Sequence, residues 1–307
     1  MIRKKLPYFA LLASLLCMPA YTHGQSYREQ RLEFAAYNVG LNALMGGIGA
    51  AINKKPGQTA GNAFLKGLGK GAAGGLLIHQ AKAAAHRIDR HEKLGWAWPA
   101  RLTNALGSSI VQNAATNRGM LDQLHLNLWL VRADYDLKEK QFLMRLLPTA
   151  VYGAVKFTNY GHLDLRRSLH TGYLYYQFTS QELLDQGVYG RSLSMAIGVG
   201  TPYYSEYMYH EVVAHEVVHG LQYESGVWIN AYLHKPDASL KKHLGWYKTL
   251  GRFVYLDANT LVQKPMRLFG RQEGCYLSRF SEKEAHHYAT RSYISCEETY
   301  GGFFPIR

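Results

Sequence analysis

Cysteines, acidic residues and long apolar runs are scarce in this chain of 307 residues. It has 3 cysteines, and its 22 acidic residues face 35 lysines and arginines. Beyond the N-terminal segment, no stretch stays apolar for the roughly 18 residues that a bilayer span needs, so we predict no transmembrane helix. A nucleic-acid-binding motif, a compact basic run, an internal repeat and a low-complexity tail are all absent, which argues against nucleic acid as a partner.

The N-terminus has the composition of an export signal. The chain begins MIRKKLPYFALLASLLCMPAYTHGQS, with three cations at positions 3–5, an apolar stretch over 7–20, and small residues after it. This pattern predicts a signal peptide over residues 1–24, with a retained N-terminal anchor as the alternative. We therefore expect an exported protein, periplasmic or extracellular.

Two cysteines, Cys275 and Cys296, are left once the signal peptide is removed. In an exported chain they predict one disulfide, and two free or buried thiols are the alternative. The formal net charge of +13 suggests association with an anionic envelope surface, against the alternative of a diffusely charged, solvated exterior.

Residues 25–120 are rich in Ala and Gly and poor in strand-forming residues. Three helices are expected there, over residues 30–53, 59–91 and 99–117. Within the second, Gly67, Gly71 and Gly75 recur at a spacing of four, which lets another helix approach closely. A soluble helical hairpin, a flexible loop and contact with a membrane surface all remain open. So does the role of this region, as a prodomain, a membrane-contacting arm or part of the catalytic core.

The composition changes near residue 121, and residues 121–307 form the second predicted region. Alternating apolar and polar residues predict strands over 121–136, 148–160, 162–178 and 191–200. A helix over 205–224, a mixed loop-like stretch over 228–250 and a last helix over 281–292 follow. This order predicts an α+β fold.

The most informative stretch is HEVVAHEVVHGLQYE, residues 210–224. Residues four apart share one helix face, so His215 and His219 can bind one ion, whereas His210, five residues before His215, diverges by roughly 140°. His215, Glu216 and His219 form the HExxH pattern, in which two histidines bind Zn²⁺ and the glutamate is the general base. A core helix with hydrogen-bonded histidines is the alternative. Glu211, one turn before His215, is either a carboxylate that orients a ligand or a solvated one.

Catalytic zinc needs a third protein ligand. The metzincin pattern requires glycine and histidine where this chain has Gln222 and Ser225, so that class is excluded. The segment SEKEAHHYA, residues 281–289, offers Glu282, and Glu284 is the alternative because it points about 200° away on a regular helix. Ala285 and Ala289 share the face of Glu282 and would permit close helix packing.

At HEVVH and EKEA the chain resembles the gluzincin metallopeptidases, in which a glutamate of Glu-x-x-Ala form follows HExxH at a distance. The resemblance implies a zincin-like catalytic region with His215, His219 and Glu282 as zinc ligands and Glu216 as base. Family members often place an aspartate four residues after the ligand glutamate, where it orients a zinc-binding histidine. This chain has His286 there, which could orient a histidine only as a neutral hydrogen-bond acceptor, or has another role. A disulfide between Cys275 and Cys296 would then bracket the helix of the third ligand.

We therefore expect an exported zinc metallopeptidase that acts on protein or peptide substrates. An oxyanion donor is expected among residues near the third ligand, namely His286, His287, Tyr288, Arg291 and Tyr293. One alternative is an envelope-associated binding protein that works through the Gly-rich helices and carries an inert or structural zinc. Another is a zinc enzyme acting on a non-peptide bond.

Overall fold

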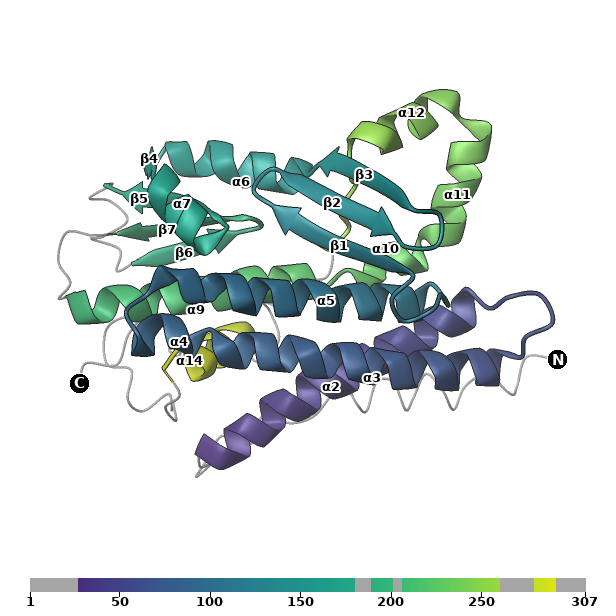
Figure 1. Cartoon of the computed structure of the whole chain (residues 1–307), viewed down its shortest axis with the longest axis horizontal. Helices are drawn as coiled ribbons and strands as arrows, with labels where there is room; N and C mark the ends of the chain where they lie inside the picture. Colours follow the sequence, from purple (N-terminus) through teal and green to yellow (C-terminus); the bar gives the residue numbers. More distant parts are fainter. Residues whose placement is uncertain (1–26, 180–188, 201–205, 260–278, 291–307) are drawn as a thin grey trace.

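The computed structural model describes residues 27–179, 189–200, 206–259 and 279–290. Within them the fold is mixed, with long helices and two small sheets, so the α+β prediction is confirmed (Figure 1). The predicted signal peptide, Cys275, Cys296, Arg291 and Tyr293 lie outside the described residues.

Three long helices form one layer of the molecule: α2 (Tyr27–Ile52), α3 (Ala60–Ala84) and α5 (Ala97–Ala115). Short α4 (His86–Arg90) and η1 (Leu94–Trp96) join α3 to α5. The break between α2 and α3 contains Pro56 and Gly57 and falls between the helices expected over 30–53 and 59–91. Thr59 caps α3 by accepting from the backbone N–H of Asn62. The three helices predicted from composition are confirmed, with α4 separated from α3 at Ala85.

The glycine spacing in α3 is used for close helix packing, as predicted. A Cβ at Gly67, Gly71 or Gly75 would collide with backbone atoms of α2, so these positions admit no side chain. On a second face of α3, Gly74 meets Gly107 of α5 in the same way. Among the described residues, α2 is the one helix long and apolar enough to cross a membrane. Here it packs along α3 and α5 and buries Asn38 and Asn42.

A three-stranded antiparallel sheet follows, formed by β1 (Gln123–Leu128), β2 (Val131–Asp136) and β3 (Gln141–Leu146). A second sheet has the order β4-β5-β7-β6, from β4 (Gly161–Leu163), β5 (Leu174–Phe178), β6 (Gly190–Leu193) and β7 (Ala196–Gly200). Its two central strands, β5 and β7, are parallel, and the outer pairs are antiparallel.

Several strand boundaries differ from the prediction. The expected strand over 121–136 is a hairpin that turns at Trp129, where φ is 52°, and the one over 191–200 turns at Ser194, where φ is 56°. The strand predicted over 162–178 contains a helix, α7 (Leu165–Thr171), which Asp164 caps and Gly172 ends with a φ of 74°.

Two further predictions are wrong. The strand expected over 148–160 is the helix α6 (Pro148–Thr158), which begins with a proline and buries Ala150, Gly153 and Phe157 at helical spacing. The stretch expected to be loop-like, 228–250, forms α10 (Trp228–Tyr232), α11 (His234–His243) and most of α12 (Gly245–Phe253). Tertiary burial of one helix face outweighs the strand preference of Val, Tyr and Phe in α6.

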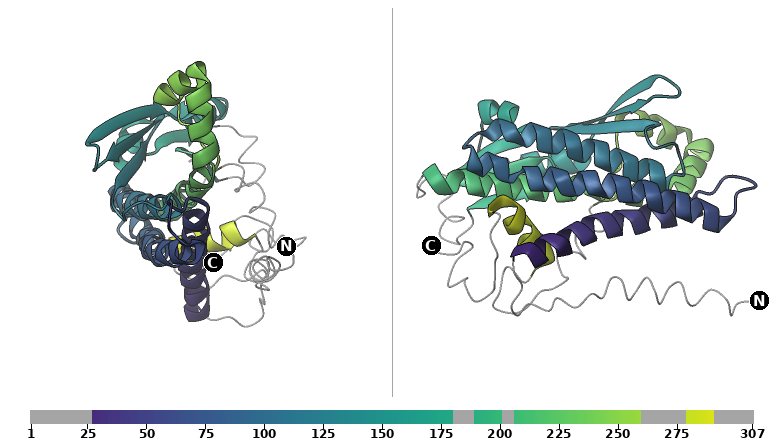
Figure 2. Two further views of the ribbon diagram at one scale, coloured as in Figure 1. Left: turned by 90° about the vertical axis from the view of Figure 1, so that its right-hand side faces the viewer. Right: turned by 60° about the horizontal axis from the view of Figure 1, so that its bottom comes forward.

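The helix that carries the HExxH pattern, α9 (Glu206–Ser225), runs along the layer boundary, and α14 (Phe280–Thr290) packs against it (Figure 2). One hydrophobic core includes buried residues of α2, α4, α5, β5, β7, α9 and α14. The helices before residue 120 therefore share a core with the elements after it.

Candidate metal centre

His215 and His219 project from adjacent turns of α9 toward one point. Their Nε2 atoms lie 3.0 Å apart, and the rings meet edge to face. The flanking valines and alanine of α9 are fully buried, so the helix is anchored in the core and its histidines have little freedom. The structure thus brings together the pair that helical spacing selects, and His210 lies half-buried elsewhere on the helix.

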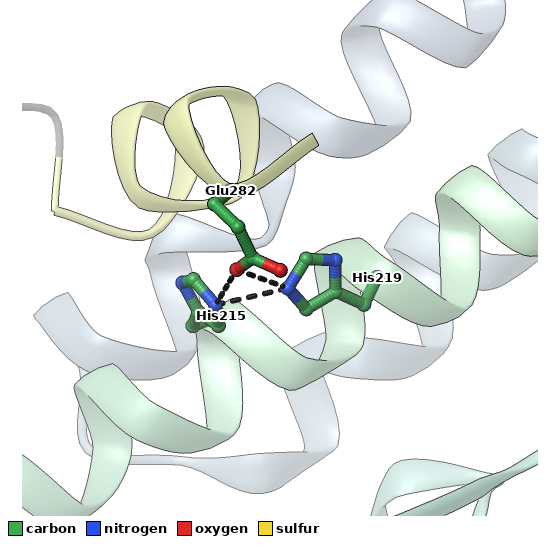
Figure 3. Close-up of side chains that lie close together, drawn as sticks. All are labelled: His215, His219 and Glu282. Carbon is green, nitrogen blue, oxygen red and sulfur yellow. Dashed lines mark hydrogen bonds and ion pairs between the residues drawn. The ribbon is translucent and has the colours of Figure 1, made fainter. Parts of the chain in front are cut away.

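Glu282 of α14 completes a three-residue cluster with the two histidines (Figure 3). Its Oε2 atom lies 3.0 Å from His219 Nε2 and 3.3 Å from His215 Nε2. Ala285 and Ala289, which are both buried against the core, allow α14 to approach α9 closely enough for this contact.

Electrostatics couples the three side chains. Burial raises the pKa of Glu282, but the charge of His219 and hydrogen bonds from both histidines outweigh it and hold that pKa well below its usual range. Burial lowers the pKa of His219, yet the charge and hydrogen bond of Glu282 prevail and raise it to about 9. For His215, burial prevails and lowers the pKa, so its imidazole is neutral.

The donor set fits zinc. Two imidazole nitrogens and one carboxylate oxygen are a known catalytic ligand set, and zinc takes such atoms at about 2.0–2.2 Å. Tetrahedral ligand atoms at that distance lie roughly 3.3 Å from one another. The separations of 3.0, 3.0 and 3.3 Å between the three donor atoms are close to this value.

Glu284, the alternative third ligand, points away from the histidines. Its carboxylate accepts from Lys82 Nζ at 2.9 and 3.0 Å and from Asn38 Nδ2 at 2.6 Å, and its side chain is almost fully buried. Lys82 also donates to Asn38 Oδ1 at 2.8 Å. The buried cation and amide therefore bind Glu284 outside the cluster, as its angle on a regular helix predicts.

Gln222 links Glu284 to the metal cluster. Its Nε2 atom donates to Glu284 Oε2 at 2.8 Å, and its Oε1 atom accepts from His219 Nδ1 at 2.8 Å. A carboxylate can only accept, so this contact fixes the orientation of the amide, and the amide oxygen in turn requires a proton on Nδ1 of His219. The Nε2 atom of His219 is thereby directed at the cluster. No local pattern indicates this role, because Gln222 and its partner Glu284 lie on different helices and meet only in the fold.

Glu216, the predicted base, is buried beside the cluster and lines a cleft of about 400 Å³ together with His219 and Glu282. Gly190, at the start of β6, packs directly on it: a Cβ there would lie 2.5 Å from Glu216 Oε1. The absence of a side chain at residue 190 is therefore required for the position of this carboxylate. Sequence reasoning missed Gly190, for which no motif exists.

Of the other residues predicted to act near the metal, one lies beside the cluster and two pack in the core. The ring of His286 lies 4.3 Å from that of His215, and burial holds the pKa of His286 well below its usual range, so it is a neutral neighbour. His287 stacks on Tyr27, and the hydroxyl of Tyr288 bonds to His79, which places both against α2 and α3 instead of the cleft. Glu211 is half-buried one turn before His215, and its role stays a prediction.

The comparisons with known proteins add no relative. No protein-family model, no curated protein and no solved structure matches this chain. What the site can do is therefore inferred from its residues and their geometry.

Proposed function

We propose that this protein is an exported zinc-dependent metallopeptidase with a zincin-like catalytic core. The observation that carries the proposal is the meeting of His215, His219 and Glu282 at one point, beside a cleft that Glu216 also lines. A purely structural zinc would need a fourth protein ligand. The described residues offer three at this point, which favours a catalytic site.

His215, His219 and Glu282 would hold the ion, and a zinc bound there would supply Lewis acidity that polarises a carbonyl and acidifies a water molecule. Glu216 accepts a proton from the attacking water and delivers it to the leaving amine. Gln222 keeps the imidazole of His219 in the tautomer that binds through Nε2. His286 shields one side of His215 from solvent.

The walls of the cleft favour an extended peptide as substrate. One wall includes β6, which is the edge strand of its sheet among the described strands. An extended chain can add to such an edge through backbone hydrogen bonds, whatever its side chains. The lining also includes Tyr37 and Leu41 of α2, which offer apolar contact.

The Gly/Ala-rich helices belong to the proposed catalytic unit. Lys82 of α3 and Asn38 of α2 bind Glu284, which holds Gln222 against His219. This chain of contacts favours a structural role for residues 27–115 over a removable prodomain. It also weakens the alternative of a binding protein that works through free glycine faces, because α2 and α5 already cover those faces of α3.

The test is zinc content and peptide hydrolysis, measured on one set of variants. We expect about one zinc per chain in the parent, its loss in His215→Ala and Glu282→Ala, and its retention in Glu216→Gln. Casein hydrolysis should disappear in all three. Parent protein that stays metal-free after zinc-replete purification would overturn the proposal, and zinc binding with no hydrolysis of casein or a peptide library would favour a non-peptide substrate.

A further inference from the structure

The three-stranded sheet β1–β3 buries its polar face, whereas a half-buried sheet ordinarily buries its apolar face. The face that packs on α5 is polar, and it carries His125, Arg132 and Asp134, which are all buried. Both ring nitrogens of His125 bond to serine hydroxyls of α5, at 3.0 and 3.1 Å. Asp134 accepts from Arg132 at 2.9 Å and from Arg145 at 2.6 Å. His125 and Asp134 thus have partners within the fold, and this polar face packs on α5 instead of facing water.

The outer face of the same sheet is entirely apolar. Strand alternation and register place three leucines of β1 beside the outward residues of β2 and β3. The outward residues of these two strands are Val131, Ala133, Tyr135, Phe142, Met144 and Leu146. Phe142 is 64% exposed and Met144 57% exposed. Antiparallel sheets normally turn their polar face outward, so an exposed apolar face marks an interaction surface.

Helix α12 adjoins this sheet and carries exposed apolar residues of its own. Trp246, Leu250 and Phe253 fall within about 60° of one another around the helix, and Trp246 and Phe253 are each 67% exposed. The residue after α12, Val254, pairs with Leu146 at the end of β3, so the helix and the sheet adjoin. Both lie on the side of the molecule remote from α2 and α14 in the two orientations (Figures 1 and 2).

The charges on α11 and α12 are mostly positive. Lys248 and Arg252 are exposed on the opposite side of α12 from its apolar residues, and Lys242 is exposed on α11. The one acidic residue of these two helices, Asp237, is bonded to Lys241. Aromatic and aliphatic residues on one helix face, with lysine and arginine on the other, are typical of helices that lie in the interface of an anionic membrane.

We propose that the outer face of β1–β3, together with Trp246, Leu250 and Phe253, docks this protein on the surface of an anionic lipid bilayer. The apolar side chains enter the boundary between headgroups and acyl chains, and the flanking cations meet lipid phosphates. The proposal is independent of the metallopeptidase activity. Since the surface lies away from α14, docking would leave the cleft accessible from the aqueous side.

Vesicle sedimentation tests the proposal with the full chain. Vesicles of phosphatidylcholine and phosphatidylglycerol in equal amounts should bind the protein at least tenfold more tightly than phosphatidylcholine alone, with a loss in high salt. Met144→Glu and Trp246→Glu should each weaken binding at least tenfold, and Lys248→Glu with Arg252→Glu should abolish the preference for the anionic lipid. Circular dichroism and zinc content, unchanged from the parent, show that each variant folds.

Leu32→Glu on α2 is the matched control, since Leu32 is also 57% exposed but lies on the remote helix. It should bind as the parent does. Equal losses in Leu32→Glu and Met144→Glu would overturn the proposal and assign membrane contact to the N-terminal helices. Unchanged binding in the Met144 and Trp246 variants would overturn it too. So would a parent dimer that these variants convert to monomer, because the surface would then cover a second copy of the chain.

Discussion

Lys82 and Glu284 form a buried salt bridge between α3 and α14, with 2.9 Å between Nζ and Oε2 and each side chain 2% exposed. The two residues are 202 positions apart in the chain. Through Gln222, this pair reaches the Nδ1 atom of His219. A helix of the Gly/Ala-rich region is thus connected to the candidate metal centre by three consecutive polar contacts.

Removal of one member of this pair should destabilise the fold strongly. Lys82→Met leaves the Glu284 carboxylate buried without its cation, which we expect to lower the free energy of unfolding by about 3–5 kcal/mol. Urea unfolding of the metal-free protein measures the effect. The double variant Lys82→Met/Glu284→Leu should lose less than the two single variants add up to, because it buries no uncompensated charge. A Lys82→Met protein as stable as the parent would contradict this account.

Gln222 should govern zinc affinity without binding the ion. Gln222→Leu removes the acceptor that fixes His219, so we expect affinity to fall about 10- to 100-fold. Competition with a chromophoric chelator measures this. Gln80→Leu, at an exposed position of α3, is the control and should leave the affinity unchanged. Parent-like affinity in Gln222→Leu would show that the imidazole is positioned by other contacts.

Zinc binding should compete with a proton on His219. The neighbouring Glu282 raises the pKa of this imidazole to about 9 in the metal-free protein, against the effect of burial. The raised pKa means that the proton is bound below about pH 9 and must leave when zinc binds. Apparent affinity should therefore fall by up to about tenfold per pH unit as the pH drops below 9, and calorimetry in two buffers should report about one proton released. A zinc affinity that does not change between about pH 6.5 and 8.5 would contradict competition between zinc and this proton.

Gly190 should affect hydrolysis without affecting metal content. In Gly190→Ala the new Cβ would lie 2.5 Å from Glu216 Oε1, so the carboxylate must move. Displacement of a proposed general base by about 1 Å can cost up to about 100-fold in rate, and we expect a 10- to 100-fold loss of casein hydrolysis. Gly61→Ala, where nothing lies within 4 Å of the new Cβ, is the control. Full activity in Gly190→Ala would mean that Glu216 is free to move.

Replacing two different glycines of α3 by alanine should change the stability of the protein in opposite directions. Gly71→Ala forces a methyl group against the backbone of Asn42 in α2, which we expect to cost about 1–3 kcal/mol of stability. Gly69→Ala meets nothing within 4 Å and should stabilise the helix by about 0.5–1 kcal/mol. Thermal unfolding of the two variants tests whether α2 and α3 are packed as described, and equal shifts would contradict it.

The sequence alone determined the features that depend on local periodicity. Spacing of four along a helix selected His215 and His219, and the angle between residues 282 and 284 separated Glu282 from Glu284. The helix boundaries near Pro56-Gly57 and the small-residue spacing of α3 indicated two helices with a face suited to close packing, and left open which partner covers that face. These signals act within one or a few helical turns, so they can be read without the fold.

Tertiary structure decided what depends on distant partners. It made α6 a helix despite its strand-forming residues, because one face of that helix is buried. It placed Lys82 and Asn38 on Glu284, which reaches His219 through Gln222, and it placed Gly190 against Glu216; no local pattern indicates these contacts. It also decided which face of β1–β3 is buried. Alternation marks an apolar and a polar face, and the polar one is buried because serines of α5 bond to His125 and Arg145 of β3 bonds to Asp134. Since a buried polar group needs a partner wherever that partner lies in the chain, such choices are settled only when the chain folds.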